Sequence, residues 1–154
     1  MSRGLGDVYK RQEMKRCVVK LDRKKAEKKA ERWQTIALGA AKQSKRMQIP
    51  TVHMPVTFQQ ALAMMAESDV RLMPYENAEG MEGTRRILES IEPGESIAIL
   101  IGPEGGIDEA EVEMAMKEKV EPITLGKRIL RTETAGMTVL SILVYLLEGR
   151  ERTR

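Results

Sequence analysis

Short apolar segments that alternate with helical patterns constrain the fold of this chain more than any other feature. Apolar runs at 70–76, 95–101 and 121–126 are separated by segments with apolar residues at three- and four-residue spacing. Strands that alternate with helices usually form a parallel sheet, because each return connection packs as a helix on a sheet face. The sequence therefore predicts the α/β class, with a mainly parallel sheet flanked by helices.

Capping residues and apolar stripes predict the remaining elements. These are a strand at 17–21, a helix from Asp22 to Met47, an extended piece at 51–56, a helix capped by Thr57 and Gln60, a short helix around Leu88, a helix from Asp108 to Lys119 and a last helix at 134–148. The last helix is apolar nearly all round, which exceeds what one sheet face can cover. We therefore expect a homodimer whose interface buries the remainder.

The charge is distributed unevenly along the chain. Its 154 residues suit one domain, and residues 1–50 hold 15 Lys and Arg against 5 Asp and Glu, whereas residues 51–154 hold 11 against 18. The first part is thus +10 and the rest −7. A cationic segment joined to an acidic body indicates contact with a polyanion such as nucleic acid, although a solvated helix face explains the charge equally well.

Several classes of protein are disfavoured by what the sequence lacks. One cysteine, Cys17, cannot form an internal disulfide or a zinc site of thiolates, and no metal is predicted. The longest apolar stretch, 137–147, is too short to span a bilayer and has no signal-peptide flanks, so we expect a cytoplasmic protein with no membrane partner. Residues 1–16 begin with a stretch of neither helical nor strand periodicity, and we expect them to be a foreign or unstructured leader.

Two loops are the candidate binding segments. In open parallel sheets, ligands bind beyond the carboxyl ends of the strands, and GPEGG (102–106) and LGKRILRTETA (125–135) each follow a predicted strand. Neither the dinucleotide pattern GxGxxG nor the phosphate-loop pattern GxxxxGK[ST] occurs. For GPEGG alone, a structural turn is the better explanation. The second loop is harder to explain in that way, because it interrupts apolar order with Lys127, Arg128 and Arg131.

Three segments together carry a resemblance to a known family. ERWQTIALGAAKQSKRMQIP, IAILIGPEGGIDEAEVE and LGKRILRTETA occur in the order found in the bacterial family that methylates N3 of a uridine in 16S ribosomal RNA, which belongs to the SPOUT superfamily of S-adenosylmethionine enzymes. The resemblance runs from about Val18 to Gly149. It implies a SPOUT domain at 17–150 that is incomplete at its N-terminus, with a C-terminal deep trefoil knot. It also implies a homodimer that acts on 16S rRNA in the small ribosomal subunit, and the absence here of the family's N-terminal PUA-like RNA-binding domain.

The resemblance places an S-adenosylmethionine pocket on three loops. The residues implied are Leu72, Met73, Ile101, Gly102, Pro103, Glu104, Gly105, Gly106, Leu125, Gly126, Ile129, Leu130, Arg131, Thr134 and Ala135. Main-chain groups of these loops would hold adenine and ribose, and Ile129 and Leu130 would contact the adenine face.

Catalytic roles follow from the chemistry of uracil N3, which carries a proton until a base removes it. Arg131 is the candidate cation beside the developing negative charge, with Glu133 or Glu104 as proton acceptor. The alternatives are that Arg131 pairs with Glu133 and that Glu104 caps a loop amide.

Candidate RNA contacts lie on the long basic helix. Gln43 and Arg46 are three residues apart and so share a helix face. They belong to the stretch AAKQSKR, which matches a recurring motif of the family, and this resemblance implies that they contact RNA or the target uridine. Lys24 and Lys28 would contact phosphates. A solvent-facing role is the alternative for all four, and Trp33, at stripe spacing, is expected in the core. Two other functions stay open: methylation of another rRNA or tRNA nucleotide, and a catalytically silent RNA-binding fragment.

Overall fold

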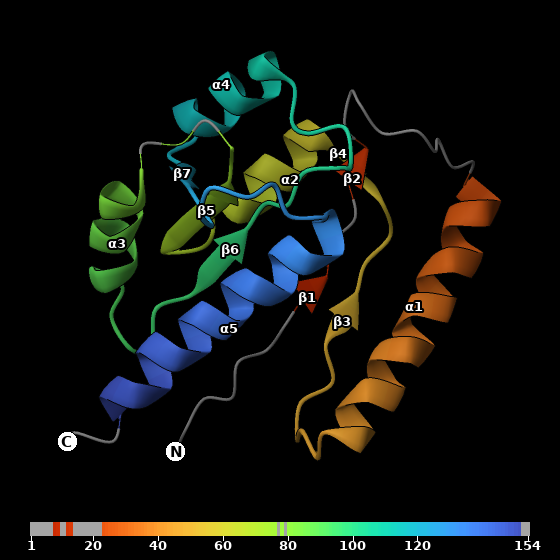
Figure 1. The fold of residues 1–154 in the computed structure, drawn as a ribbon. Coiled ribbons are helices and arrows are strands. Elements are labelled where there is room, and N and C mark those ends of the chain that lie inside the picture. The colour runs from red at the N-terminus through yellow and green to blue at the C-terminus, as the bar shows by residue number, and fades with distance from the viewer. Residues whose placement is uncertain (1–7, 10–11, 14–22, 77, 79, 152–154) are drawn as a thin grey trace. The chain divides into compact units, whose positions relative to one another are not determined.

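The structure, a computed structural model, describes residues 8–9, 12–13, 23–76, 78 and 80–151. The chain forms two compact units, Met1–Ala61 (unit 1) and Leu62–Arg154 (unit 2), with the boundary inside helix α2 (Phe58–Met65). Figure 1 gives the labels of the elements.

Unit 1 combines one long helix, α1 (Arg23–Gln43), with four two-residue strands. β1 (Val8–Tyr9) pairs in parallel with β3 (Thr51–Val52), and β2 (Gln12–Glu13) pairs in parallel with β4 (Val56–Thr57). Of the two expectations for residues 1–16, a foreign or an unstructured leader, the unstructured one is therefore wrong for β1 and β2. Strands of two residues are too short to show alternation, which is why the sequence did not indicate them.

The α1 helix ends earlier than predicted, at Gln43 instead of Met47. The Arg46 amide donates to the Ala41 carbonyl (2.9 Å), the Lys45 amide donates to the Lys42 carbonyl (3.2 Å), and Lys45 has a φ of 56°. These are the two hydrogen bonds and the left-handed residue of a Schellman motif. Such a motif usually contains glycine, so a lysine at this position gives no sequence signal for the helix end.

Capping boxes at two helices confirm the predicted starts. At α2, the Thr57 amide donates to Gln60 Oε1 (3.0 Å) and the Gln60 amide donates to Thr57 Oγ1 (3.3 Å). At α4 (Glu109–Lys117), the Asp108 side chain accepts from the Ala110 amide, and the Asp108 amide donates to Glu111. Each box satisfies amides at a helix start that have no partner within the helix.

Unit 2 is built on a three-stranded parallel sheet with the order β6-β5-β7. The strands are β5 (Val70–Pro74), β6 (Ile97–Ile99) and β7 (Glu121–Ile123). Helices α3 (Met81–Glu89), α4 and α5 (Thr132–Glu151) complete the unit (Figure 1). The predicted class, α/β with a parallel sheet flanked by helices, is confirmed.

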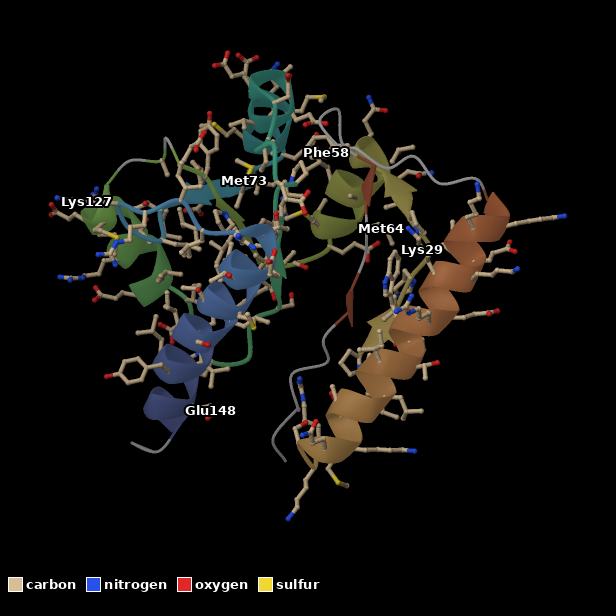
Figure 2. The ribbon with its side chains drawn as sticks, turned by 45° about the vertical axis from the view of Figure 1, so that its right-hand side comes forward. Lys29, Phe58, Met64, Met73, Lys127 and Glu148 are labelled. Atoms are coloured by element: carbon tan, nitrogen blue, oxygen red, sulfur yellow. The ribbon has the colours of Figure 1, made fainter. Side chains whose placement is uncertain are left out.

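The core of unit 2 joins the sheet to α3 and α5. A cluster of buried side chains links these elements: Leu72, Leu88, Ile91, Ile123, Val139 and Leu143. Met73 follows Leu72 in the strand and so points to the opposite sheet face, where it too is fully buried (Figure 2). Both faces at the centre of the sheet are therefore covered, which fixes the strand ends that carry the candidate loops.

Several boundaries differ from the sequence prediction. α3 begins at Met81, before the predicted short helix, and α5 begins at Thr132, two residues before the expected start. β6 is shorter than the apolar run at 95–101, and its three residues are half-buried.

The predicted strand at 17–21 and the predicted cap Asp22 lie outside the described residues. In the part of the chain that the structure describes, no helix has the length and hydropathy needed to cross a membrane.

Candidate functional site

The two candidate loops of unit 2 are joined by a side chain. Thr132 Oγ1, at the first residue of α5, donates a hydrogen bond of 3.0 Å to the Gly102 carbonyl at the start of the GPEGG turn. The two loops therefore meet at the carboxyl end of the sheet, as the strand topology predicts. Sequence reasoning placed the start of the last helix at Thr134 and did not identify Thr132 as a site residue.

The first loop is a tight turn that requires glycine. The Gly106 amide donates to the Pro103 carbonyl (2.9 Å), and Gly106 has a φ of 75°. At Gly102, a Cβ would lie 2.6 Å from Ile107 Cγ1, so a side chain there would displace the buried Ile107. Glu104 and Gly105 are exposed at the outside of the turn, whereas Ile101 and Pro103 are half-buried.

The second loop is held at its base by another threonine. Thr84 of α3, 3% exposed, accepts a hydrogen bond from the Thr124 amide (2.8 Å) through its Oγ1. The Thr124 hydroxyl in turn bonds the amide and carbonyl of Gly126 (3.3 Å each), which has a φ of 113°. Leu125 packs against the core cluster. The loop thus leaves the sheet in a fixed direction.

The tip of the second loop is both apolar and basic. Ile129 is 84% exposed and Leu130 is half-buried, so both offer apolar surface to a ligand. Lys127, Arg128 and Arg131 are exposed around them. This combination suits a flat heterocycle that carries a charged or polar substituent.

The candidate catalytic residues flank the junction of the loops. Arg131 and Glu133 stand on either side of Thr132, and Glu104 lies two residues after Gly102. Arg131 and Glu133 are both exposed, and among the described residues no ion pair joins them, so the alternative of a structural pair is not realised. The Ala135 amide donates to the Arg131 carbonyl (2.8 Å), while Ala135 is buried and Thr134 half-buried in the first turn of α5.

Two of the expected cofactor residues lie in the core instead. Leu72 and Met73 expose none of their surface. They belong to the central strand β5, which is covered on both faces, so their side chains support the loops from below and are not available to a ligand in this conformation.

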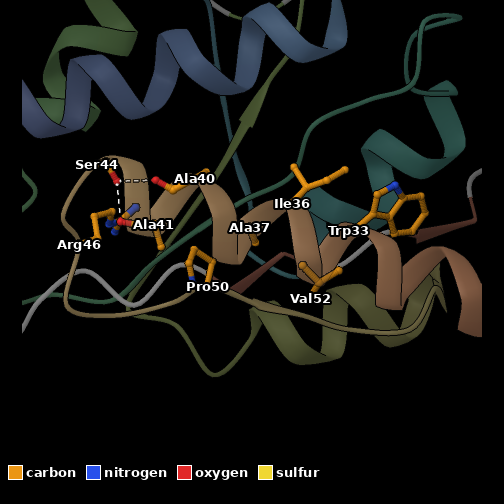
Figure 3. Close-up of a pocket in the computed structure, with 9 residues that line it drawn as sticks. All are labelled: Trp33, Ile36, Ala37, Ala40, Ala41, Ser44, Arg46, Pro50 and Val52. Carbon is orange, nitrogen blue, oxygen red and sulfur yellow. Dashed lines mark hydrogen bonds between the residues drawn. The ribbon is translucent and has the colours of Figure 1, made fainter.

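The candidate RNA contacts belong to unit 1 and differ from expectation in one respect. Lys24, Lys28, Gln43 and Arg46 are all exposed. Gln43 is the last residue of α1 and Arg46 lies in the Schellman turn, so the argument that both share one helix face is wrong. The turn instead brings Arg46 to one end of a hollow of about 350 Å³ beside α1 (Figure 3).

Trp33 lines this hollow and is half-buried, where the sequence predicted a core position. A second hollow, of about 650 Å³, follows α5 from Thr134 to Leu146. His53 is half-buried, and no group of three or more potential metal ligands occurs within the described ranges.

One carboxylate has a perturbed titration, at the amino ends of the strands and so away from the candidate loops. Asp69 accepts hydrogen bonds from the Ser96 hydroxyl (2.6 Å) and amide (2.8 Å), and these bonds lower the pKa of Asp69 below its ordinary value of 3.8. The bonds join the start of β5 to the start of β6, so Asp69 is a structural residue.

Sequence relatives of this chain are RNA-modifying enzymes. Residues 12–144 match the family model for the RNA methyltransferase domain. Ribosomal RNA small subunit methyltransferase E of Bacillus subtilis is 44% identical over 136 residues, which cover 86% of this chain and 53% of the relative. The protein of the same name from Mesomycoplasma hyopneumoniae is 37% identical, over 75% of this chain and 48% of the relative. The chain spans about half the length of these relatives.

Solved structures of methyltransferases have a similar fold. A ribosomal RNA small subunit methyltransferase E from Neisseria gonorrhoeae bound to S-adenosyl methionine matches with a TM-score of 0.76 and 32% identity, over 91% of this chain and 55% of that one. A putative methyltransferase from Legionella pneumophila in complex with the same cofactor matches with a TM-score of 0.77 and 32% identity, over 87% and 53%. With the family model covering most of its length and both candidate loops, the chain belongs to the RNA methyltransferase domain family.

Proposed function

We propose that this chain belongs to an S-adenosylmethionine-dependent methyltransferase that methylates N3 of a uridine in 16S rRNA of the small ribosomal subunit. The observation that carries the proposal is the hydrogen bond between Thr132 and the Gly102 carbonyl, which joins both candidate loops into one site. The names of the relatives support the substrate, since those proteins are small-subunit ribosomal RNA methyltransferases.

The residues present fit the cofactor. The backbone turns at Gly102–Gly106 and Leu125–Gly126 offer amides and carbonyls to adenine and ribose, and exposed Ile129 with half-buried Leu130 offers apolar contact to the adenine ring. When bound, S-adenosylmethionine supplies a methyl group that its sulfonium already activates. The protein therefore contributes chiefly alignment of the two reactants and exclusion of water.

Arg131 and a carboxylate act on the acceptor base. Removal of the N3 proton leaves negative charge on the uracil ring, and the exposed Arg131 guanidinium, which has no ion pair with Glu133, is available to stabilise that charge. Glu133, which follows Thr132, and Glu104, two residues after Gly102, are the two candidate acceptors of the proton. An exposed position for all three is consistent with a macromolecular substrate that itself completes the site.

Two measurements on the whole chain test the proposal. Isothermal titration with S-adenosylmethionine should give micromolar binding, and incubation with small ribosomal subunits that lack the modification should yield 3-methyluridine in mass mapping of 16S rRNA. Methylation of a different nucleotide would retain the enzyme class and replace the substrate. Absence of both binding and transfer would contradict the proposal and favour a silent RNA-binding module.

The finer architecture that the family resemblance implies is a deep trefoil knot in unit 2 and a homodimer. The α5 helix supports the dimer, because Met137 and Tyr145 are 63% and 81% exposed along the second hollow. An apolar surface of this kind commonly marks an interface. Sedimentation at micromolar concentration should give a dimer that Tyr145→Glu dissociates, and a monomeric wild type would contradict it.

A further inference from the structure

We propose that the hollow beside α1, here called the Trp33 hollow, binds an unpaired nucleobase of the RNA substrate. The proposal rests on the proposed function and deepens it, because it assigns a base-binding site to unit 1 in addition to the loops of unit 2. Three features carry it: the shape and lining of the hollow, the fixed position of Arg46, and the charge of α1.

The lining is mostly apolar, with one aromatic ring. Trp33 lies at the middle of α1 and Arg46 lies beyond the C-terminal end of the helix, with Ile36, Ala37 and Pro50 among the apolar side chains between them (Figure 3). The volume of about 350 Å³ falls in the range of small-ligand pockets, about 300–1,000 Å³. An indole that lines such a space offers a stacking surface, which is how proteins hold unpaired bases without reading their sequence.

The walls of the hollow are fixed before any ligand arrives. Gln34 of α1 donates from Nε2 to the Pro50 carbonyl (2.9 Å) and accepts at Oε1 from the Val52 amide (2.8 Å). These two bonds tie the strand β3 to the helix, and Pro50 and Val52 both line the hollow. A preformed wall lowers the entropic cost of binding.

Arg46 is placed at the hollow by the end of the helix. Its amide donates to the Ala41 carbonyl in the Schellman turn, and Ala41 also lines the hollow. The turn therefore fixes the backbone of Arg46 beside the hollow. Beside an aromatic-lined space, a guanidinium suits the phosphate that precedes or follows a stacked base.

The surrounding charge favours RNA over other apolar partners. Residues 23–46, which include α1 and its closing turn, hold nine Lys and Arg against two Glu, a net charge of +7. Nonspecific single-strand binding combines such a positive surface with aromatic side chains. An apolar protein segment could pack against the lining of the hollow, but it would not neutralise the positive charge of the surrounding helix.

Trp33 provides the test, because it is the only tryptophan in the chain. Titration of the whole protein with a fluorescein-labelled ten-nucleotide oligouridylate is followed by anisotropy, and the unlabelled oligomer is used to follow Trp33 emission. We expect emission to be quenched over the same concentration range in which anisotropy rises, because stacking places the base against the indole. Trp33→Ala should weaken binding by about 5- to 150-fold, whereas Trp33→Phe should retain most of the affinity.

A matched pair of charge variants distinguishes binding in the hollow from general electrostatic attraction to the helix. Arg46→Gln and Lys29→Gln each remove one exposed positive charge from this segment, and only Arg46 lines the hollow. Both should lower the salt dependence of binding to a similar degree. Arg46→Gln alone should reduce the quench of Trp33 at saturation.

Three outcomes would overturn the inference. They are complete binding by anisotropy with unchanged Trp33 emission, no binding of the oligouridylate, and emission that depends on protein concentration alone, which would place a second copy in the hollow. Titration with S-adenosylmethionine keeps the two proposals distinct. Quenching of Trp33 by RNA without cofactor binding would support this inference and contradict the proposed function. Cofactor binding with methyl transfer but without quenching would support the proposed function and contradict this inference.

Discussion

The two units of the molecule carry opposite charge and present different kinds of surface. Unit 1 has a net charge of +10 and unit 2 a net charge of −7, since residues 51–61 contain no Lys, Arg, Asp or Glu. Unit 1 presents a long basic helix with an apolar hollow, whereas unit 2 presents backbone turns joined by threonine side chains. We infer that affinity for RNA resides mainly in unit 1 and that cofactor binding and chemistry reside in unit 2.

If chemistry resides in unit 2, replacement of Arg131 should give the largest loss of methyl transfer among the variants proposed here. Arg131→Gln should lower methyl transfer to small ribosomal subunits by about 10²- to 10³-fold, the usual cost of removing one group that stabilises developing charge. The affinity for S-adenosylmethionine should change by less than about twofold, because its binding relies on backbone and apolar groups. Rates at saturating cofactor and titration calorimetry measure the two quantities separately.

Arg85→Gln is the control for charge, since Arg85 is an exposed arginine on α3 of the same unit. Its transfer rate should stay close to that of the wild type. If Arg131→Gln lowered cofactor affinity and transfer equally, Arg131 would be a binding residue and would have no separate role toward the base.

Thr132 tests whether the two loops form one site. Thr132→Val keeps the shape of the side chain and removes the bond to the Gly102 carbonyl, which should cost about 1 kcal/mol, or about fivefold in the dissociation constant for S-adenosylmethionine. Thr132→Ser keeps the hydroxyl and should restore most of the affinity. Equal affinities for the valine and serine variants would mean that the loops are held together by other interactions.

Lys24 and Lys28 test the role of unit 1. Both are exposed on α1, and replacing both with glutamine should lower the slope of log affinity for RNA against log salt concentration. The expected decrease is about 0.7 for each phosphate that a lysine side chain neutralises in the wild-type complex. Cofactor affinity should be unchanged. A loss of cofactor binding with an unaltered salt slope would reverse the assignment of functions to the two units.

The sequence predicted those features of the two units that depend on regular patterns of residues. The parallel sheet, the capping boxes at Thr57 and Asp108, and the meeting of the two loops at one end of the sheet all follow from spacing and topology. The charge of unit 1 was evident from composition. These features are local or depend on strand order, which is why one sequence suffices to predict them.

The features that the sequence did not predict depend on single tertiary interactions. A threonine at position 132 gives no sign that its hydroxyl reaches Gly102, thirty residues away. The end of α1 was missed because Lys45 adopts the conformation usual for glycine. Leu72 and Met73 were assigned to the cofactor by resemblance alone, and whether a strand is central and covered on both faces is known only from the assembled sheet.

Asp69 makes the stability of unit 2 sensitive to acid. The Ser96 hydroxyl and amide lower the pKa of folded Asp69, so its stabilising contribution is complete above the ordinary value of 3.8 and is lost as the pH falls through the folded value. Asp69→Asn should lower the melting temperature at neutral pH, and the difference from wild type should disappear in strong acid. Glu67→Gln removes an exposed carboxylate two residues away and should show no such convergence.

The smallest effect we predict compares the same motif in both units. α1 and α4 both end in a Schellman turn with lysine at the left-handed position, Lys45 with a φ of 56° and Lys119 with a φ of 60°. The left-handed conformation costs a residue with a Cβ about 1–2 kcal/mol, and glycine removes this cost. Glycine also increases the conformational entropy of the unfolded chain, which offsets part of the stabilisation. Lys45→Gly and Lys119→Gly should therefore each stabilise the protein by about 0.5–1 kcal/mol in urea denaturation. If the units unfold independently, Lys45→Gly shifts the transition seen by Trp33 fluorescence and Lys119→Gly does not, whereas equal shifts for both variants would show that the two units unfold as one.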